Sequence, residues 1–502
     1  MTPEVDLPDH LNLVEYFLER RLAEGRGARV ALTIDSPDGE VRNVTYAEVL
    51  ALAHRYAAAL HAAGVRPEER VGIALDDGAD WVGAFFGILH LGAVVVLLNP
   101  DLDGDELLGL VDYTGIRMVV AAPRVEERLT GRATILGPLG DHACPPRANT
   151  HRDDGAIWLF SGGTTGRPKA VAQSHGAFVN TTVLTAHGVY GYGPDDVTLS
   201  VPKLYFGYAT GMNLLFPFSV GARAVLFPDR CTPERVAGLV ARHRPTVLVN
   251  VPTFVGKLLR DAPHADLSSV RLSTSAGEAL PEALFVAFRE QFGVELLDGL
   301  GTAEMWHVFL TNRPGQVRPG TLGRPVPGFE VEVRDDEGRP LPDGDTGWLW
   351  VRGRSRALGY VRALEATARA FQGEWYVSGD MVRRDADGVF TYCGRGDDML
   401  KVSGKWVAPR DVESCLSEHV AVHECAVVGV ADAHGLTRLC AYVLPAPGYD
   451  AAELPTRLGT YLRARLQAYK VPREVIVVHA FSRTHLGKID RGELRRLGAS
   501  RE

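Results

Sequence analysis

The sequence predicts an α/β protein. It has a large N-terminal domain, with mixed or parallel sheets flanked by helices, and a small α+β C-terminal domain. Three features support this prediction. Helix and strand signals alternate as far as Gly320, which is typical of a largely parallel sheet. Short strands separated by turns follow and indicate a β-rich subdomain. The segment beyond them has its own strands and helix. We therefore expect domains at 1–396 and 397–502.

The first elements carry clear signals. Residues 45–48 form a capping box, in which the Thr45 hydroxyl and the Glu48 carboxylate satisfy free amides at a helix start. The alanine- and leucine-rich run that follows stops at Gly64, a residue type common at helix C-termini. Residues 71–75 then predict a short buried strand.

An apolar stretch at 81–98 is long enough to raise the question of a membrane span. Its three glycines, Gly83, Gly87 and Gly92, argue against one. The pattern instead predicts a buried helix up to Leu91 and a buried strand at 94–98, stopped by an Asn-Pro pair. We therefore expect no membrane span.

Further strands are predicted along the rest of the chain. In the middle they fall at 222–227, 246–251 and 270–275, with helices between them. In the β-rich part they fall at 329–334, 347–352 and 388–393. The C-terminal domain is predicted to contain strands at 424–430, 439–444 and 474–479 and an amphipathic helix at 455–467.

The composition excludes several classes of function. The chain of 502 residues has 54 basic and 62 acidic side chains, a net charge of −8, which is atypical of nucleic-acid-binding proteins. Its six cysteines form no CxxC pair and no cluster with zinc spacing. The acidic, polar N-terminus lacks the features of a signal peptide. We expect a cytoplasmic protein with reduced thiols that binds neither nucleic acid nor membrane.

The strongest chemical signal is a run that follows an apolar segment: Ser161, Gly162, Gly163, Thr164, Thr165, Gly166, Arg167, Pro168 and Lys169. Glycines let backbone amides approach phosphate oxygens, hydroxyls add donors, and Lys169 can place a charge beside a phosphate. The run is not a Walker A loop, because the GK[ST] ending is absent. It predicts a phosphate-binding loop, although taken alone it also fits a flexible polar surface loop.

Four more segments follow this run along the chain, at 301–304, 376–380, 392–398 and 484–489. The five together resemble, in the same order, the signatures of the ANL superfamily of adenylate-forming enzymes. This superfamily includes acyl-CoA synthetases, adenylation domains and firefly luciferase. The four segments resemble its G-[ST]-T-E segment, its glycine–aspartate ribose motif, its hinge and its C-terminal lysine loop. The resemblance covers most of the chain.

The resemblance implies a role for each matched residue. The family joins a carboxylate to the α-phosphorus of ATP, which needs positive charge around a crowded anionic centre. Lys488 would approach the carboxylate and the α-phosphate, while Lys169 would add charge at the phosphates. Glu304 would help hold Mg²⁺, a cation that prefers oxygen ligands. Asp380 would accept hydrogen bonds from the ribose, and Arg395 would contact the ribose or a phosphate.

The sequence departs from the family at Ala303, where threonine is usual, so a hydroxyl expected near the α-phosphate is missing. We expect Thr302 to compensate. The family also rotates its C-terminal domain between its two half-reactions, so we expect this domain to be mobile. Asp397 matches the hinge position, where a few residues absorb the backbone change. Residues 403–406 would then help to form the channel for the thiol.

Segments at 203–211, 275–281 and 298–310 resemble those of benzoate–CoA ligases, which implies an aromatic acid. Tyr208, Gly277 and His307 would line a flat slot for the ring, and Gly207 would leave space for an ortho or meta substituent. Ordinary core packing is the alternative for these aromatic residues. Residues 203–208 include no carboxylate to pair with the ammonium of an amino acid, which argues against such a substrate.

The sequence thus predicts an AMP-forming ligase that uses ATP, Mg²⁺ and coenzyme A to convert benzoate or a substituted benzoate into a thioester. We expect it to act as a monomer or a homodimer on small molecules. Two alternatives remain. The thiol could belong to the phosphopantetheine of an aryl carrier protein, because no fused carrier domain decides the matter. A non-catalytic nucleotide-binding relative is disfavoured by the presence of Lys488 and Glu304.

Overall fold

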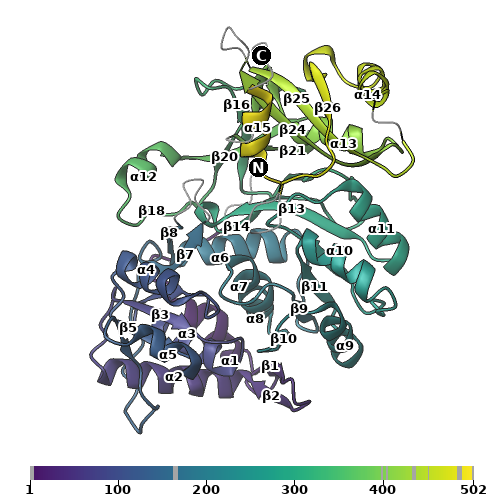
Figure 1. Ribbon diagram of the computed structural model, residues 1–502. Coiled ribbons are helices and arrows are strands. Elements are labelled where there is room, and N and C mark those ends of the chain that lie inside the picture. Colours follow the sequence, from purple (N-terminus) through teal and green to yellow (C-terminus); the bar gives the residue numbers. More distant parts are fainter. Residues whose placement is uncertain are drawn as a thin grey trace. The chain divides into compact units, whose positions relative to one another are not determined.

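The computed structural model describes residues 5–161, 168–396, 399–402, 405–431, 437–449, 452–482 and 489–499 (Figure 1). The chain divides into two compact units. Unit 1 comprises Met1–Val331 and Trp350–Val377, and unit 2 comprises Glu332–Leu349 and Ser378–Glu502. Contacts thus group residues 378–396 with the C-terminal part of the chain. The expected boundary between residues 396 and 397, at which the C-terminal domain would rotate, stays a prediction.

Unit 1 contains a nine-stranded mixed sheet with the order β15-β14-β13-β12-β11-β9-β10-β1-β2. Neighbours from β13 to β1 pair in parallel, and the strands at both edges pair antiparallel. The strands are β1 Val30–Asp35, β2 Val41–Thr45, β9 Val197–Ser200, β10 Arg223–Leu226, β11 Val247–Asn250, β12 Leu272–Ser275, β13 Leu296–Thr302, β14 His307–Thr311 and β15 Arg324–Pro325.

A second, seven-stranded sheet of unit 1 has the order β18-β8-β7-β4-β3-β5-β6. Its central strands are parallel, whereas β8 pairs antiparallel with both β7 and β18. The strands are β3 Arg70–Ala74, β4 Val94–Leu97, β5 Met118–Ala121, β6 Thr134–Ile135, β7 Gly155–Ser161, β8 Lys169–Ser174 and β18 Gly359–Tyr360. The alternation of helices and strands predicted from the sequence therefore forms two mixed sheets.

Helices connect and cover these strands, and Figure 1 shows α9, α10 and α11 side by side next to β9 and β11. Their apolar faces bury residues such as Leu239, Val255 and Phe288 in one core cluster. Burial of each such side chain contributes about 1.5–3 kcal/mol. The helices are α1 Arg20–Ala23, α2 Tyr46–Ala62, α3 Ala79–His90, α4 Gly104–Thr114, α5 Pro123–Leu129, α6 His175–Thr181, α7 Gly207–Thr210, α8 Phe216–Val220, α9 Pro233–His243, α10 Pro252–Asp261, α11 Glu282–Phe292 and α12 Leu364–Ala370.

Two predictions about the first part of the chain are confirmed. The Glu48 amide donates to the Thr45 hydroxyl at 3.2 Å, and the Thr45 amide donates to the Glu48 carboxylate at 2.7 Å, so the capping box starts α2. The apolar stretch at 81–98 is divided between the buried helix α3 and the buried strand β4. Among the described residues, no helix combines the length and the apolar character that crossing a bilayer requires.

A buried ionic cluster ties β1 to α9. The Asp35 side chain is 0% exposed; it forms ion pairs with Arg235 at 2.9 Å and Arg242 at 3.0 Å and accepts a hydrogen bond from His243 at 2.6 Å. Burial opposes ionisation of this carboxyl, but hydrogen bonds from His243 and Arg235 and the two guanidinium charges outweigh it, so the pKa of Asp35 is lowered. The carboxylate therefore stabilises the folded chain at neutral pH.

In unit 2, β24 pairs with β25 and β25 with β26 to form a three-stranded sheet, and β22 pairs with β23. The chain passes between the units within β16, β17 and β20, and β21 pairs with β20. The remaining elements are β16 Glu330–Arg334, β17 Thr346–Arg352, β19 Phe371–Gln372, β20 Trp375–Arg384, β21 Phe390–Arg395, β22 Leu400–Val402, β23 Lys405–Val407, β24 Val422–Ala431, β25 Thr437–Pro445, β26 Glu474–Val477, α13 Pro409–Ser417, α14 Leu454–Arg463 and α15 Arg491–Ala499. The strands and the helix predicted for this part match these bounds closely.

Candidate active site

Strands β7 and β8 position the two ends of the predicted phosphate loop. Ser161 is the last residue of β7 and lies directly opposite Lys169, the first residue of β8, in an antiparallel hairpin. A hairpin of this kind holds the ends of the connecting loop together. The predicted residues Gly162, Gly163, Thr164, Thr165, Gly166, Asp397 and Lys488 lie outside the described residues.

Tyr360 links the two unit 1 residues expected at the phosphates and the metal. Its hydroxyl donates to Oε1 of Glu304 at 2.7 Å, and the Lys169 ammonium lies 5.1 Å from the centre of its ring. Strand β18 pairs with β8, which brings Tyr360 opposite Val171, two residues after Lys169. Glu304 is only 5% exposed. The fold therefore holds one carboxylate at the hydroxyl of Tyr360 and one ammonium near its ring.

The chemistry around Glu304 fits a hard cation. Its carboxylate oxygens are of the ligand type that Mg²⁺ prefers, and its described hydrogen-bond partner is a neutral hydroxyl. No ion pair joins it to a cationic side chain among the residues that the structure describes. A buried carboxylate in this state gains from a bound cation.

The backbone before Glu304 is held firmly. The Gln173 amide donates to the Ala303 carbonyl at 2.6 Å, and the Ala357 amide donates to the Glu304 carbonyl at 2.7 Å. Oγ1 of Thr302 is buried and has no hydrogen-bond partner among the described residues. Thr302 thus offers a free hydroxyl one residue before Ala303, where the family's hydroxyl is missing.

Tyr208 and His307, predicted to line the ring slot, do come together. Their ring centres are 5.3 Å apart, and Nε2 of His307 donates to the Tyr208 carbonyl at 3.2 Å. The Tyr208 hydroxyl shares a 2.6 Å hydrogen bond with Thr274 on β12. Phe216 also packs against the imidazole, with ring centres 4.7 Å apart. These residues come from α7, β12, β14 and α8, so the sheet brings the aromatic cluster together.

The imidazole of His307 is neutral at physiological pH, because burial lowers the pKa of His307 to about 4. Since Nε2 carries the proton donated to Tyr208, Nδ1 is an acceptor. That Nδ1 atom is buried and has no hydrogen-bond partner among the described residues. Leaving a buried acceptor unsatisfied costs about 1–3 kcal/mol, so a donor placed there would be favoured.

Close approach and unusual backbone surround His307. A Cβ atom at Gly211 would lie 2.7 Å from Nε2 of the imidazole and closer still to Cδ2. Trp306 and His307 adopt φ values of 44° and 74°, which are strained for residues other than glycine. Consecutive strained residues persist only where the surroundings enforce them, and they cluster at functional sites.

The other two glycines predicted in the slot differ from each other. A Cβ atom at Gly207 would lie 3.3 Å from Leu159 and 3.4 Å from Trp306, which is tight contact. At Gly277, where φ is 86°, a Cβ atom would meet nothing within 4 Å. The space beside Gly207 is therefore bounded by two side chains, and any room for a ring substituent is small.

In unit 2 the predicted ribose residue Asp380 is paired with Arg395. Asp380 is 3% exposed and lies opposite Arg395 across β20 and β21, where the guanidinium donates to Oδ1 at 3.0 Å. Ser378 donates to Oδ2 at 2.5 Å, and Tyr392 donates to Oδ1 at 3.4 Å. A carboxylate offers about four acceptor positions, so these three donors, counted over the described residues, leave capacity for one more.

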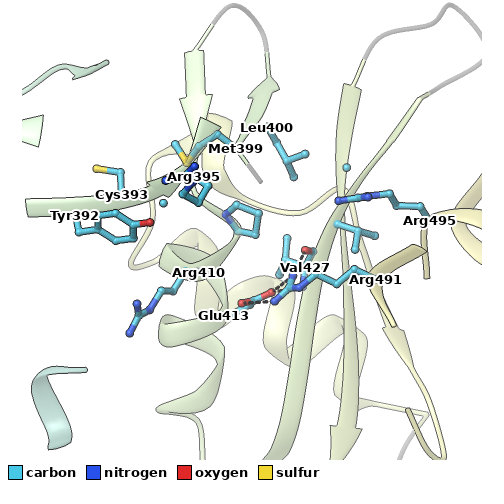
Figure 2. Close-up of a pocket in the computed structure, with 14 residues that line it drawn as sticks. Tyr392, Cys393, Arg395, Met399, Leu400, Arg410, Glu413, Val427, Arg491 and Arg495 are labelled. Atoms are coloured by element: carbon cyan, nitrogen blue, oxygen red, sulfur yellow. Dashed lines mark hydrogen bonds and ion pairs between the residues drawn. The ribbon is translucent and has the colours of Figure 1, made fainter. Parts of the chain in front are cut away.

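Unit 2 also contains a cavity of about 350 Å³, which the sequence did not predict (Figure 2). Its lining comes from β21, β22, α13, β24 and α15 and includes Arg395. Figure 2 shows Arg491 reaching Glu413, with which it forms contacts of 2.7 and 3.0 Å. Glu413 thus neutralises Arg491, and apolar residues such as Met399, Leu400 and Val427 share the lining.

Comparison with known proteins identifies the protein family to which the chain belongs. Residues 18–361 match the family described as AMP-binding enzyme, and residues 411–488 match the AMP-binding enzyme C-terminal domain. The chain belongs to the AMP-binding enzyme family. This confirms the family that the five sequence signatures predicted.

The chain is similar to aryl–CoA ligases over its whole length. A benzoate–CoA ligase of Thauera aromatica is 36% identical over 520 residues, which covers 98% of this chain and 97% of the relative. The structure of an anthranilate–CoA ligase in complex with anthranoyl-AMP is 37% identical, with a TM-score of 0.84 and 99% of each chain covered. A benzoate–CoA ligase structure from Burkholderia xenovorans LB400 is 36% identical, with a TM-score of 0.81 and coverage of 96% and 99%. These matches confirm the predicted fold class.

Sequence reasoning missed several residues of the site. Tyr360 follows no recognised signature, and only the pairing of β18 with β8 places it beside Glu304. Thr274 lies one residue before the segment 275–281, and Phe216 lies five residues after the segment 203–211; β12 and α8 bring them to the aromatic cluster. The glycine at 211 was inside a segment predicted to resemble benzoate–CoA ligases, but nothing in the sequence signalled its contact with His307.

Proposed function

We propose that this chain is an AMP-forming acid–thiol ligase that activates benzoate or a substituted benzoate and transfers the acyl group to coenzyme A. The enzyme class predicted from the sequence is confirmed by the family and by relatives named benzoate–CoA ligases. The buried aromatic cluster around Tyr208 and neutral His307 is the observation that supports an aryl acid as the substrate. Such a slot suits a planar apolar ring and offers an ammonium no charged partner.

In the proposed first step, a carboxylate oxygen attacks the α-phosphorus of ATP and diphosphate leaves. In the second, the sulfur of coenzyme A attacks the acyl carbon and AMP leaves. We assign the loop from Ser161 to Gly166 and Lys169 to the phosphates, and Lys488 to the reacting carboxylate and α-phosphate. Mg²⁺ held at Glu304 would offset charge on the phosphates. Fixed cations and donors at such a centre stabilise charge that develops in the transition state.

Residues in unit 2 would bind the rest of the nucleotide. Asp380 has remaining acceptor capacity and would receive a ribose hydroxyl, while Arg395, which already orients Asp380, would contact the ribose or a phosphate. Thr302 would supply the hydroxyl missing at Ala303. Asp397 would serve as the hinge between the two half-reactions. A cytoplasmic location and a monomeric or homodimeric state stay predictions.

His307 narrows the proposed substrate range. We propose that the bound ring reaches the unsatisfied Nδ1 of His307, which is an acceptor, so that benzoates that carry a hydroxyl or amino group bind more tightly than benzoate. Relatives with such substrates include the anthranilate–CoA ligase. The tight surroundings of Gly207 set an upper limit on substituent size.

The proposal is tested by diphosphate release. The purified chain is incubated with ATP, Mg²⁺ and a panel of benzoates, cinnamates and short aliphatic acids, first without and then with coenzyme A. We expect diphosphate with benzoates and an aryl–CoA thioester after coenzyme A is added. If none of the aromatic acids caused the release of diphosphate, the proposal would be refuted. Acyl transfer to a phosphopantetheinylated aryl carrier protein but not to coenzyme A would show that the carrier protein is the acyl acceptor.

A further inference from the structure

The segment that carries the ring slot is anchored by a buried carboxylate from another part of unit 1. Asp77 lies in the turn between β3 and α3 and is 6% exposed. Its Oδ1 accepts the Leu204 amide at 3.0 Å, although the two residues are 127 positions apart. A carboxylate from a distant loop thus binds the backbone of the segment 203–208.

The neighbours of Leu204 are fixed in the same way. The Thr210 hydroxyl donates to the Leu204 carbonyl at 2.6 Å, so both polar groups of that residue are bound. The Lys203 ammonium donates to the Phe227 carbonyl at 2.5 Å and lies 3.5 Å from the centre of the Phe227 ring. Two hydrogen bonds and one cation–π contact therefore hold the start of the segment that leads to Tyr208.

We propose that Asp77 and Lys203 are positioning residues for the aryl acid: they fix the backbone of residues 203–206 and thereby place Tyr208 and Gly207 in the ring slot. This inference rests on the proposed function. The anchor is charge-assisted, because the acceptor is a carboxylate and the donor a backbone amide. Loss of the anchor would loosen the slot without touching the residues assigned to ATP.

Charge around Asp77 makes the anchor sensitive to pH. Burial raises the pKa of Asp77 to about 6, while Lys203 and the hydrogen bond from Leu204 oppose the rise and Asp76 adds to it. Lys203 in turn is faced by Asp77, Asp229 and the thiol of Cys231, and burial lowers its pKa. The hydrogen bond to Leu204 is therefore strongest above pH 6 and weakens as the pH falls below it.

The test compares the effect of each substitution on the KM for the aryl acid with its effect on the KM for ATP. Asp77→Ala removes the acceptor, Asp77→Asn keeps an acceptor without the charge, and Asp76→Asn is the matched control because Asp76 is paired with Arg124. We expect Asp77→Ala to raise the KM for the aryl acid about tenfold or more, with the KM for ATP within about twofold of wild type. At pH 8, Asp77→Asn should recover part of the loss, and Asp76→Asn should leave both KM values near those of wild type. Because Asp76 adds to the rise in the pKa of Asp77, Asp76→Asn should move the fall in kcat/KM for the acid to lower pH.

Two further measurements distinguish positioning from a general structural role. The fall in kcat/KM for the acid near pH 6 should vanish in Asp77→Asn and move to higher pH in Lys203→Met. Because burial raises the pKa of Asp77, its ionised form lowers the stability of the folded chain above pH 6. The melting temperature of Asp77→Asn at pH 8 should therefore be no lower than that of wild type. These readouts apply even if Asp77→Ala does not fold.

Equal rises in both KM values, an unchanged KM for the acid, or a lower melting temperature of Asp77→Asn at pH 8 would overturn the inference. A wild-type chain that releases no diphosphate with any aryl acid would instead refute the proposed function. The two failures are therefore distinguishable.

Discussion

The contact between Gly211 and His307 allows a demanding test of the ring slot. Gly211 has φ near −67°, so alanine is compatible with its backbone, and only the new methyl group matters. That methyl would lie 2.7 Å from Nε2 and closer still to Cδ2, whereas ordinary contacts begin near 3.4 Å, so the imidazole would have to move by about 1 Å. Such a shift breaks the hydrogen bond between Nε2 and the Tyr208 carbonyl.

The magnitude follows from two terms. Overpacking costs about 1–3 kcal/mol, and loss of the hydrogen bond costs about 0.5–1.5 kcal/mol. If most of this appears as weaker binding of the acid, kcat/KM for the acid falls by about tenfold to several hundredfold in Gly211→Ala. The KM for ATP should stay within about twofold of wild type, because the change is confined to the ring slot.

The assay is diphosphate release with benzoate and hydroxybenzoates as the acid is varied at saturating ATP. Gly238→Ala in α9 is the control, since a Cβ atom there meets nothing within 4 Å, and it should leave activity unchanged. Adding Gly211→Ala to His307→Ala should cost little beyond His307→Ala alone, because the clashing ring is gone. Full activity of Gly211→Ala, or additive losses in the double variant, would refute the reasoning.

Three other predictions follow from the geometry. Tyr360→Phe removes the hydrogen bond to Glu304 and should lower kcat about tenfold while raising the Mg²⁺ concentration needed for half activity. Tyr56→Phe is the control, because it removes a hydrogen bond of 3.0 Å from a tyrosine hydroxyl to the Asp80 carboxylate between α2 and α3. Equal effects of the two changes would contradict this role of Tyr360. Asp35→Asn should lower the free energy of unfolding by about 3 kcal/mol at pH 7 in urea titrations. Because the folded pKa of Asp35 is lowered, that difference should shrink as the pH falls below about 4, and a difference that grows would be inconsistent. Lys488→Ala should abolish adenylate formation but spare thioester formation from supplied acyl-AMP, whereas equal damage to both half-reactions would argue against its assignment.

The sequence by itself determined the elements and the reaction class. The capping box at Thr45 predicted where α2 begins, because two side chains satisfy local amides whatever the rest of the chain does. Periodicity and glycines separated α3 from β4 within the apolar stretch at 81–98. The five signatures predicted the family, since glycine, lysine and carboxylate types at fixed places reflect what phosphates and metal ions require.

Only the tertiary structure decided which distant residues meet. Asp77 reaches Leu204, Tyr360 reaches Glu304, and Gly211 reaches His307 through sheet pairing and helix packing that local patterns do not encode. The neutral state of His307 likewise depends on burial by residues from several elements. Local chemistry sets what a residue can do, while long-range packing sets its distance, its solvent and therefore its charge.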